Sequence, residues 1–188
     1  MKRVFLALPA GDNPGIREHY DSIRASLAEE TIKWVRPENL HLTLHFFGDM
    51  EEEALARADG LFRQHLRNLP VFDLVFRDAG VFPTEHRPRV LWFGVAANAA
   101  LDRLAEAVGD VLLEGDLPLP DKPFSPHLTI GRIKWIGDRR SLGQLLQKYK
   151  GEEIARLPVG EVHLIESILR PEGPEYRTLY KYLLREEA

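Results

Sequence analysis

Hydrophobic positions along the chain follow two spacings, one typical of strands and one typical of helices. Short apolar runs and every-second-residue patterns predict strands at 3–9, 41–47, 72–83, 87–96, 127–134, 161–169 and 175–184. Apolar residues three or four positions apart predict helices at about 14–29, 50–68, 99–114 and 139–150. Asp49 is expected to cap the second helix, whose first turn is the acidic run 51–53.

Two parts of the chain repeat the same order of expected elements: helix, strand, helix, strand, strand. In each part the tripeptide His-Leu-Thr opens the central strand, at 41–43 and at 127–129. Repetition in a fixed order is the sign of an internal duplication. The sequence therefore predicts one domain over 1–188, built from two related lobes at about 10–96 and 97–188.

Alternation along a strand places His41 and Thr43 on one face, and it does the same for His127 and Thr129. The leucines between them point to the opposite face, which is expected to be the core. If the two lobes pack around an approximate two-fold axis, both polar faces line one groove. A lone histidine in a strand is usually a surface or half-buried residue, but the repeated setting favours a site.

His45 follows the first motif and is expected, by the same alternation, on the face of His41. It has no counterpart in the second copy, where Gly131 stands. Zinc is disfavoured, because four residues of strand separate His41 from His45 by about 13 Å and no His-Glu-x-x-His helix is present. No metal ligands are assigned.

Two histidines and two threonines suit an in-line displacement at phosphorus. Histidine titrates near neutral pH, so one imidazole can take a proton from water while the other gives one to the leaving oxygen. The hydroxyls of Thr43 and Thr129 can donate to the phosphoryl oxygens as charge builds there. Arg132 is the nearest cation, but strict alternation puts it on the opposite face from His127, so its participation requires a bulge or a twist.

Composition narrows the class of protein. The chain has 188 residues, of which 44% are hydrophobic and 29% charged, as in ordinary globular domains. The sequence lacks an apolar run of membrane-spanning length, its start is a poor signal peptide, and it has no cysteine, so a cytoplasmic protein without a membrane partner is expected. The net charge of −4 argues against coating nucleic acid, although a local basic groove stays open.

The chain resembles the two-histidine phosphoesterase superfamily, and within it the RNA 2′,3′-cyclic phosphodiesterases, also called 2′-5′ RNA ligases. The resemblance is carried by the two His-x-Thr motifs about half a chain apart and by the segments RVFLALP, VRPENLHLTLHFFG, VFPTEHRPRVLWFGV, FSPHLTIGRIK and LIESILRPEGPEYRTL. It implies an α+β fold with two lobes, in which two antiparallel sheets form a central cleft and helices lie outside.

The resemblance also implies roles for individual residues. His41 and His127 correspond to the catalytic pair, Thr43 and Thr129 to the phosphate-contacting threonines, and Arg132 to the following basic residue. The implied reaction opens a terminal 2′,3′-cyclic phosphate to a 2′-phosphate without metal or cofactor, His127 activating water and His41 protonating the leaving 3′ oxygen. Relatives often carry lysine at the position of His45, which suggests a contact to RNA phosphate.

Two other functions stay open at this point. One is a phosphodiesterase for small cyclic nucleotides or ADP-ribose cyclic phosphate, and the other is an RNA-binding or nucleotide-binding module without turnover. A preference for oligonucleotides would favour RNA, and a strand-binding track is expected from Lys33, Arg36, Arg89, Arg132 and Lys134. The expected partners are RNA ends bearing a cyclic phosphate, with tRNA fragments as one candidate, and the expected state is a monomer. Reverse ligation of RNA ends through a 2′-5′ linkage is a further activity of relatives.

Overall fold

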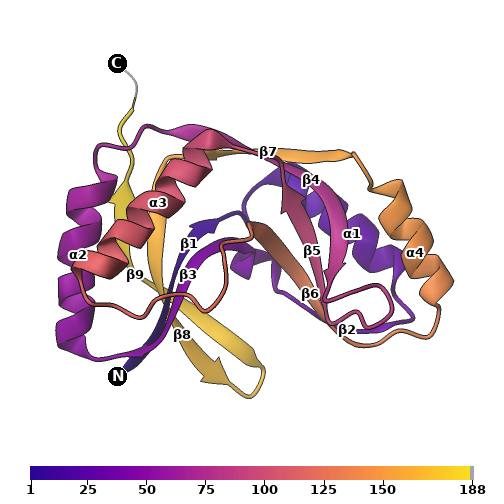
Figure 1. The fold of residues 1–188 in the computed structure, drawn as a ribbon. Coiled ribbons are helices and arrows are strands. Elements are labelled where there is room, and N and C mark those ends of the chain that lie inside the picture. The colour runs from indigo at the N-terminus through magenta and orange to yellow at the C-terminus, as the bar shows by residue number, and fades with distance from the viewer. Residues whose placement is uncertain (187–188) are drawn as a thin grey trace.

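The computed structural model describes residues 1–186, and within them the chain forms nine strands, four α-helices and one 3₁₀ turn (Figure 1). In chain order these elements are β1 (Lys2–Pro9), α1 (Pro14–Ser26), β2 (Thr31–Trp34), η1 (Pro37–Asn39), β3 (His41–Met50), α2 (Glu52–Leu66), β4 (Phe72–Phe82), β5 (Val90–Val95), α3 (Ala99–Glu114), β6 (His127–Trp135), α4 (Arg139–Lys148), β7 (Glu153–Val159), β8 (Glu161–Arg170) and β9 (Gly173–Leu183).

The four expected helices and seven expected strands are confirmed, and two strands were missed. β2 has four residues, none of them fully buried, and β7 carries Pro158 at one edge of the sheet, so neither gave a clear apolar alternation. The expected cap at Asp49 is wrong, because β3 continues to Met50 and Glu51 precedes the first turn of α2.

All nine strands belong to one antiparallel sheet. Its order is β7-β4-β5-β6-β3-β1-β8-β9, and β2 pairs with β6 beside this path. β3 and β6 lie at the centre, where a single residue pair, Leu42 with Leu128, joins them. The two sheets expected from the sequence are therefore two parts of one curled sheet, connected where the two His-Leu-Thr strands begin.

Helices lie at both ends of the curled sheet. α1 contacts β7 and α4 contacts β4, whereas α2 and α3 pack on one another and against β9 and β3. Figure 1 shows the result as an arch with two arms, α1 and α4 at one end and α2 and α3 at the other. The fully buried rings of Tyr20, Phe62, Phe76 and Phe93 belong to the core of the two arms. The α+β class expected from the resemblance is confirmed.

Each arm takes strands from both halves of the sequence. One contains β3 and β1 with β8 and β9, and the other contains β4 and β5 with β6 and β7. The expected lobes, 10–96 and 97–188, are thus segments of the sequence, and each of them contributes strands to both arms. Among residues 1–186, no helix is both long enough and apolar enough to cross a lipid bilayer.

Candidate active site

The pair of Leu42 and Leu128 fixes which residues meet at the centre of the sheet. Both leucines are completely buried, so the residues on either side of them point to the other, inner face. In an antiparallel pair, the register that sets Leu42 against Leu128 also sets His41 towards Thr129 and Thr43 towards His127. The two motifs therefore form one group of four side chains related by an approximate two-fold axis.

A bulge in β6 brings Arg132 to the same face. Trp92 pairs with Thr129 and Leu91 with Gly131, so Ile130 is the extra residue of a β-bulge. Ile130 and Gly131 are both buried, and Arg132 is exposed on the face of Thr129. The bulge that the sequence required for Arg132 is therefore present, and Arg132 lines the same cavity as His41.

The matching bulge in β3 has the opposite consequence for His45. Ala7 pairs with Thr43 and Leu6 with His45, so the alternation breaks after Thr43. His45 turns to the core side, where it is 6% exposed and its ring packs edge-on against Phe47 at 4.6 Å between centroids. The expectation that His45 shares a face with His41 is wrong, and Phe46, 47% exposed, takes the place equivalent to Arg132.

His41 is held by one hydrogen bond and two aromatic rings. Its Nδ1–H donates to the carbonyl oxygen of Asn39 at 2.6 Å, which leaves Nε2 as the free nitrogen. The ring lies 4.8 Å from that of Phe5 and 5.4 Å from that of Tyr176, between centroids. Burial lowers the pKa of His41 below the usual 6.5, the Asn39 carbonyl partly offsets this effect, and the electrostatic influence of the nearby His127 adds to the lowering.

His127 is oriented in the same way from the other strand. Its Nδ1–H donates to the carbonyl oxygen of Ser125 at 2.8 Å, again two residues earlier in the chain. Phe82 meets its ring edge-on at 5.0 Å, and Phe82 in turn lies 5.0 Å from Trp92. Both histidines thus have an imidazole fixed by a backbone carbonyl and an aromatic neighbour, with Nε2 available for proton transfer.

A cavity of about 340 Å³ lies over these residues. His41, Thr43, Thr129 and Arg132 contribute to its lining. The remaining lining residues come from β2 with the turn after it and from the start of β9: Lys33, Trp34, Val35, Arg36, Asn39, Glu172, Gly173, Pro174 and Tyr176. His127 is not part of this lining and borders it through its register with Thr43.

Tyr176 is a cavity residue that the sequence did not single out. Its ring contacts His41 and Phe5, and the Asn39 amide donates to the carbonyl of nearby Pro174 at 3.4 Å. Burial raises the pKa of the Tyr176 phenol, the positive charge of Arg132 partly lowers it, and both residues line the cavity. Tyr176 lies far from His41 along the chain, and only its place in an alternating strand marked it.

The arrangement matches the needs of phosphoryl chemistry. Two imidazoles can exchange protons on two sides of a phosphorus atom, and two hydroxyls and a guanidinium can bind its oxygens. No cluster of three or more histidine, aspartate or glutamate side chains within residues 1–186 has the geometry of a metal site.

Comparison with known proteins finds matches over most of the chain. The family model of the 2′-5′ RNA ligase superfamily matches residues 13–169. The RNA 2′,3′-cyclic phosphodiesterase of Methanothermobacter thermautotrophicus is 35% identical over 184 residues, covering 97% of this chain and 98% of that protein. The enzyme of the same name from Aquifex aeolicus is 40% identical over 155 residues, covering 81% of each chain.

Solved structures share the fold over almost the whole chain. The crystal structure of TT0787 from Thermus thermophilus superposes with a TM-score of 0.80 at 30% identity, covering 99% of this chain and 100% of that one. The structure of Escherichia coli LigT complexed with 3′-AMP gives a TM-score of 0.76 at 26% identity, with 97% and 98% covered.

Proposed function

Because this chain belongs to the 2′-5′ RNA ligase superfamily, we propose that it is an RNA 2′,3′-cyclic phosphodiesterase that converts a terminal 2′,3′-cyclic phosphate to a 2′-phosphate. The observation that carries the proposal is the central pair of strands, which sets His41 towards Thr129 and Thr43 towards His127 beside one cavity. Relatives of 35% and 40% identity bear the name of this activity.

In the proposed reaction, neutral His127 takes a proton from water through Nε2 as the water oxygen attacks phosphorus. The bond from phosphorus to O3′ breaks, and protonated His41 gives its Nε2 proton to O3′. The product keeps the phosphate on O2′. Thr43, Thr129 and Arg132 stabilise the charge that develops on the non-bridging oxygens. Acid and base are both side chains of this protein, so we propose that turnover needs no metal ion.

His41 must carry a proton to act as the acid, although burial lowers its pKa in the free protein. The anionic phosphate of the substrate favours the charged form of a nearby imidazole and so raises that pKa on binding. The proposed role of His41 as the acid therefore requires that substrate binding keeps its imidazole protonated. The opposite assignment would use neutral His41 as the base.

The direct test is an RNA with a 3′-terminal 2′,3′-cyclic phosphate, incubated with the protein in EDTA, with the two possible phosphate positions resolved in the product. We expect a 2′-phosphate. His41→Ala and His127→Ala should each lower the rate by about 10²-fold or more. His65→Ala, which removes an imidazole bonded to Glu114 between α2 and α3, is the matched control.

Each other outcome has a distinct meaning. A 3′-phosphate product would reverse the regiochemistry, and unchanged rates in both histidine variants would refute the site. Saturable RNA binding without product would leave only a binding module. Adding an RNA with a 5′-hydroxyl end tests ligation, because that hydroxyl can take the place of water and leave a 2′-5′ linkage.

We further propose that the protein acts on the ends of RNA fragments, such as those of tRNA, as a monomer. One chain supplies both motifs: His41, Thr43 and Thr129 line the cavity and His127 borders it, so no residue of a second copy is needed. Light scattering at assay concentration should give the mass of one chain, 21.5 kDa. Activity found only in a dimeric fraction would contradict this part of the proposal.

A further inference from the structure

A second cavity lies at the far end of β6. It has a volume of about 300 Å³ and is lined by residues 86–89, 133–136 and Arg139, which we call the distal basic pocket. These residues come from the loop between β4 and β5, the end of β6 and the start of α4. None of them is used by the reaction described above.

The distal basic pocket carries a concentration of positive charge. Segments 84–89 and 132–140, which form and adjoin it, contain six lysine or arginine residues against two acidic residues, in a chain whose net charge is −4. In the described part of the chain, none of these six cations makes an ion pair with a carboxylate; they are Arg87, Arg89, Arg132, Lys134, Arg139 and Arg140. Unpaired cations gathered on an acidic protein favour an anionic ligand.

Two nearby carboxylates, those of Asp138 and Glu30, are already engaged in hydrogen bonds. Asp138 accepts from Ser141 at the start of α4, and both oxygens of Glu30 accept from the backbone N–H groups of Gly137 and Asp138. The Arg139 guanidinium donates to the carbonyl of His86 at 3.0 Å, which ties the loop to the helix. The charge of the pocket is therefore held on a hydrogen-bonded frame.

An exposed indole stands at the rim of this pocket. Trp135 is 62% exposed, and its ring lies against Gly137, where a side chain would collide with it. The Glu30 bonds fix the turn that carries Gly137. A large aromatic face kept in water at a fixed position costs free energy unless a partner covers it. Beside several cations, the partner whose chemistry fits is a nucleic acid base next to its phosphates.

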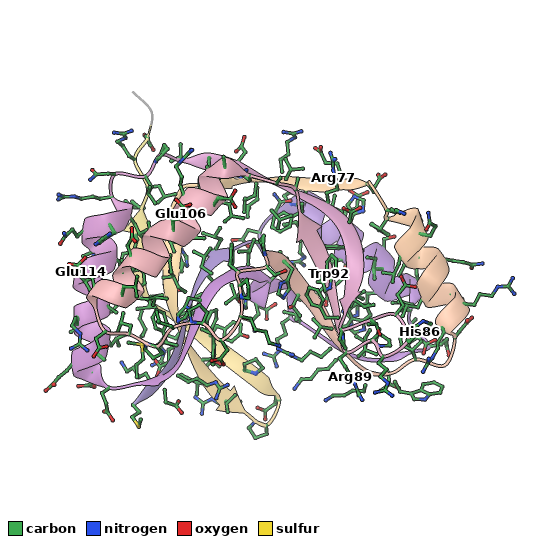
Figure 2. The ribbon with its side chains drawn as sticks, in the orientation of Figure 1. Arg77, His86, Arg89, Trp92, Glu106 and Glu114 are labelled. Atoms are coloured by element: carbon green, nitrogen blue, oxygen red, sulfur yellow. The ribbon has the colours of Figure 1, made fainter. Side chains whose placement is uncertain are left out.

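The linings of the two cavities include neighbouring residues of one strand, β6. Arg132 lines the catalytic cavity, and Ile133 and Lys134 line the distal basic pocket. Lys33 of β2 pairs with Arg132, and the carbonyl of Arg89 accepts from Ile133 N–H at 2.9 Å. Trp135 lies six positions after Thr129 along β6, a span of about 20 Å. Figure 2 shows His86 and Arg89 on this arm, whereas the labelled acidic residues Glu106 and Glu114 lie on the other.

We propose that the distal basic pocket binds a single RNA strand upstream of its 3′-terminal nucleotide, with phosphates on its lysine and arginine residues and one base stacked on Trp135. The inference rests on the proposed function, which places the cyclic phosphate in the catalytic cavity. A cyclic mononucleotide fills that cavity alone, and an oligonucleotide occupies both. The pocket thereby selects RNA ends over free cyclic nucleotides.

The test compares kcat/KM for 2′,3′-cyclic AMP and for a short RNA ending in the same cyclic nucleotide. Trp135→Ala should lower kcat/KM for the RNA by about tenfold, as for loss of one stacked base, and leave that for 2′,3′-cyclic AMP within twofold. Lys134→Glu should do the same and flatten the salt dependence measured with the RNA. Arg103→Glu, an exposed charge reversal on α3, is the control and should change neither substrate.

A binding measurement tests the distal basic pocket separately from the proposed catalytic function. Fluorescence anisotropy of a labelled RNA ending in a 2′-phosphate reports the pocket even if no turnover occurs, and Trp135→Ala should weaken that binding. Turnover of both substrates with equal changes in every variant would overturn the pocket and leave the proposed function standing. Equal RNA binding by the wild type and Trp135→Ala, with unchanged thermal midpoints, would also overturn it.

Discussion

His41 and His127 donate the same hydrogen bond from equivalent places: each Nδ1–H reaches the carbonyl oxygen two residues earlier, at 2.6 and 2.8 Å. Each bond fixes the tautomer and turns Nε2 outward. The surroundings then differ, since His41 lies between Phe5 and Tyr176 and His127 meets Phe82. Two copies of one motif therefore place their imidazoles in different surroundings.

The pH dependence of turnover should identify the role of His41. Burial lowers its pKa below 6.5 in the free protein. If His41 is the acid, the alkaline limb of kcat/KM falls at that lowered pKa, and the same limb in kcat lies at higher pH because bound phosphate favours the imidazolium. Rate profiles of both parameters, with the His41 signal titrated by NMR, check this. Finding the His41 pKa in the acidic limb would make it the base.

Tyr176 should act through its ring as a positioning residue. The ring packs against His41 and Phe5, so Tyr176→Ala removes a wall that holds the imidazole in place. Misplacement of a catalytic group by about 1 Å can cost 10²-fold in rate, and we expect a loss of at least tenfold in kcat. Tyr176→Phe keeps the ring and should stay within a few fold. Equal losses in both variants would instead assign the effect to the hydroxyl.

His45 should make the fold sensitive to acid. Burial lowers its pKa, the nearby Pro118 carbonyl partly offsets this lowering, and its Nε2 has no partner among residues 1–186. Below about pH 6.5 the unfolded chain takes up a proton that the folded chain resists, so the free energy of unfolding falls as pH drops towards the folded-state pKa.

Urea unfolding at a series of pH values measures this effect. His45→Leu should lose less stability than the wild type between pH 7 and the acidic end of the series. His86→Leu, which replaces an exposed histidine, should keep the slope of the wild type. An unchanged slope in His45→Leu would show that the buried imidazole is protonated as easily as a free one.

Gly131 should tolerate no larger side chain. It lies in the β6 bulge, and a Cβ there would approach Cγ2 of Ile32 to 2.8 Å and the ring of Trp34 to 3.3 Å. Gly131→Ala is therefore expected to destabilise the protein by about 1–3 kcal/mol, as overpacking does, and to lower activity through Arg132. Gly60→Ala on α2, where space is open, is the control. The thermal midpoint and kcat/KM of both variants provide the measurement.

The sequence predicted those features that depend on local spacing. Leu42 and Leu128 alternate with the motif residues, so the buried and the cavity-facing sides of the two strands followed from period alone. Repetition of His-Leu-Thr then related the two strands. The repetition does not predict that the two strands meet at one residue pair, because that contact joins positions in different halves of the chain.

The residues after the two bulges show where alternation along a strand no longer predicts which face a side chain takes. Alternation put His45 on the cavity side, but pairing of Leu6 with His45 and of Ala7 with Thr43 shifts it to the core. The same shift in β6 admits Arg132, which the sequence allowed only on condition of a bulge. Tyr176 was missed because its contact with His41 depends on how β9 curls over β1, a relation between the two ends of the chain.

The exchange of strands between the arms has a consequence for how the chain reaches its fold. β1 pairs with β8, and β4 pairs with β7, so neither arm is complete until most of the polypeptide has left the ribosome. Contacts this distant in sequence give a high contact order. This slows folding, because long loops must close, at a cost in chain entropy, before these contacts can stabilise the fold. During synthesis, β1 and β4 therefore each have an unpaired edge until β8 and β7 are made and pair with them.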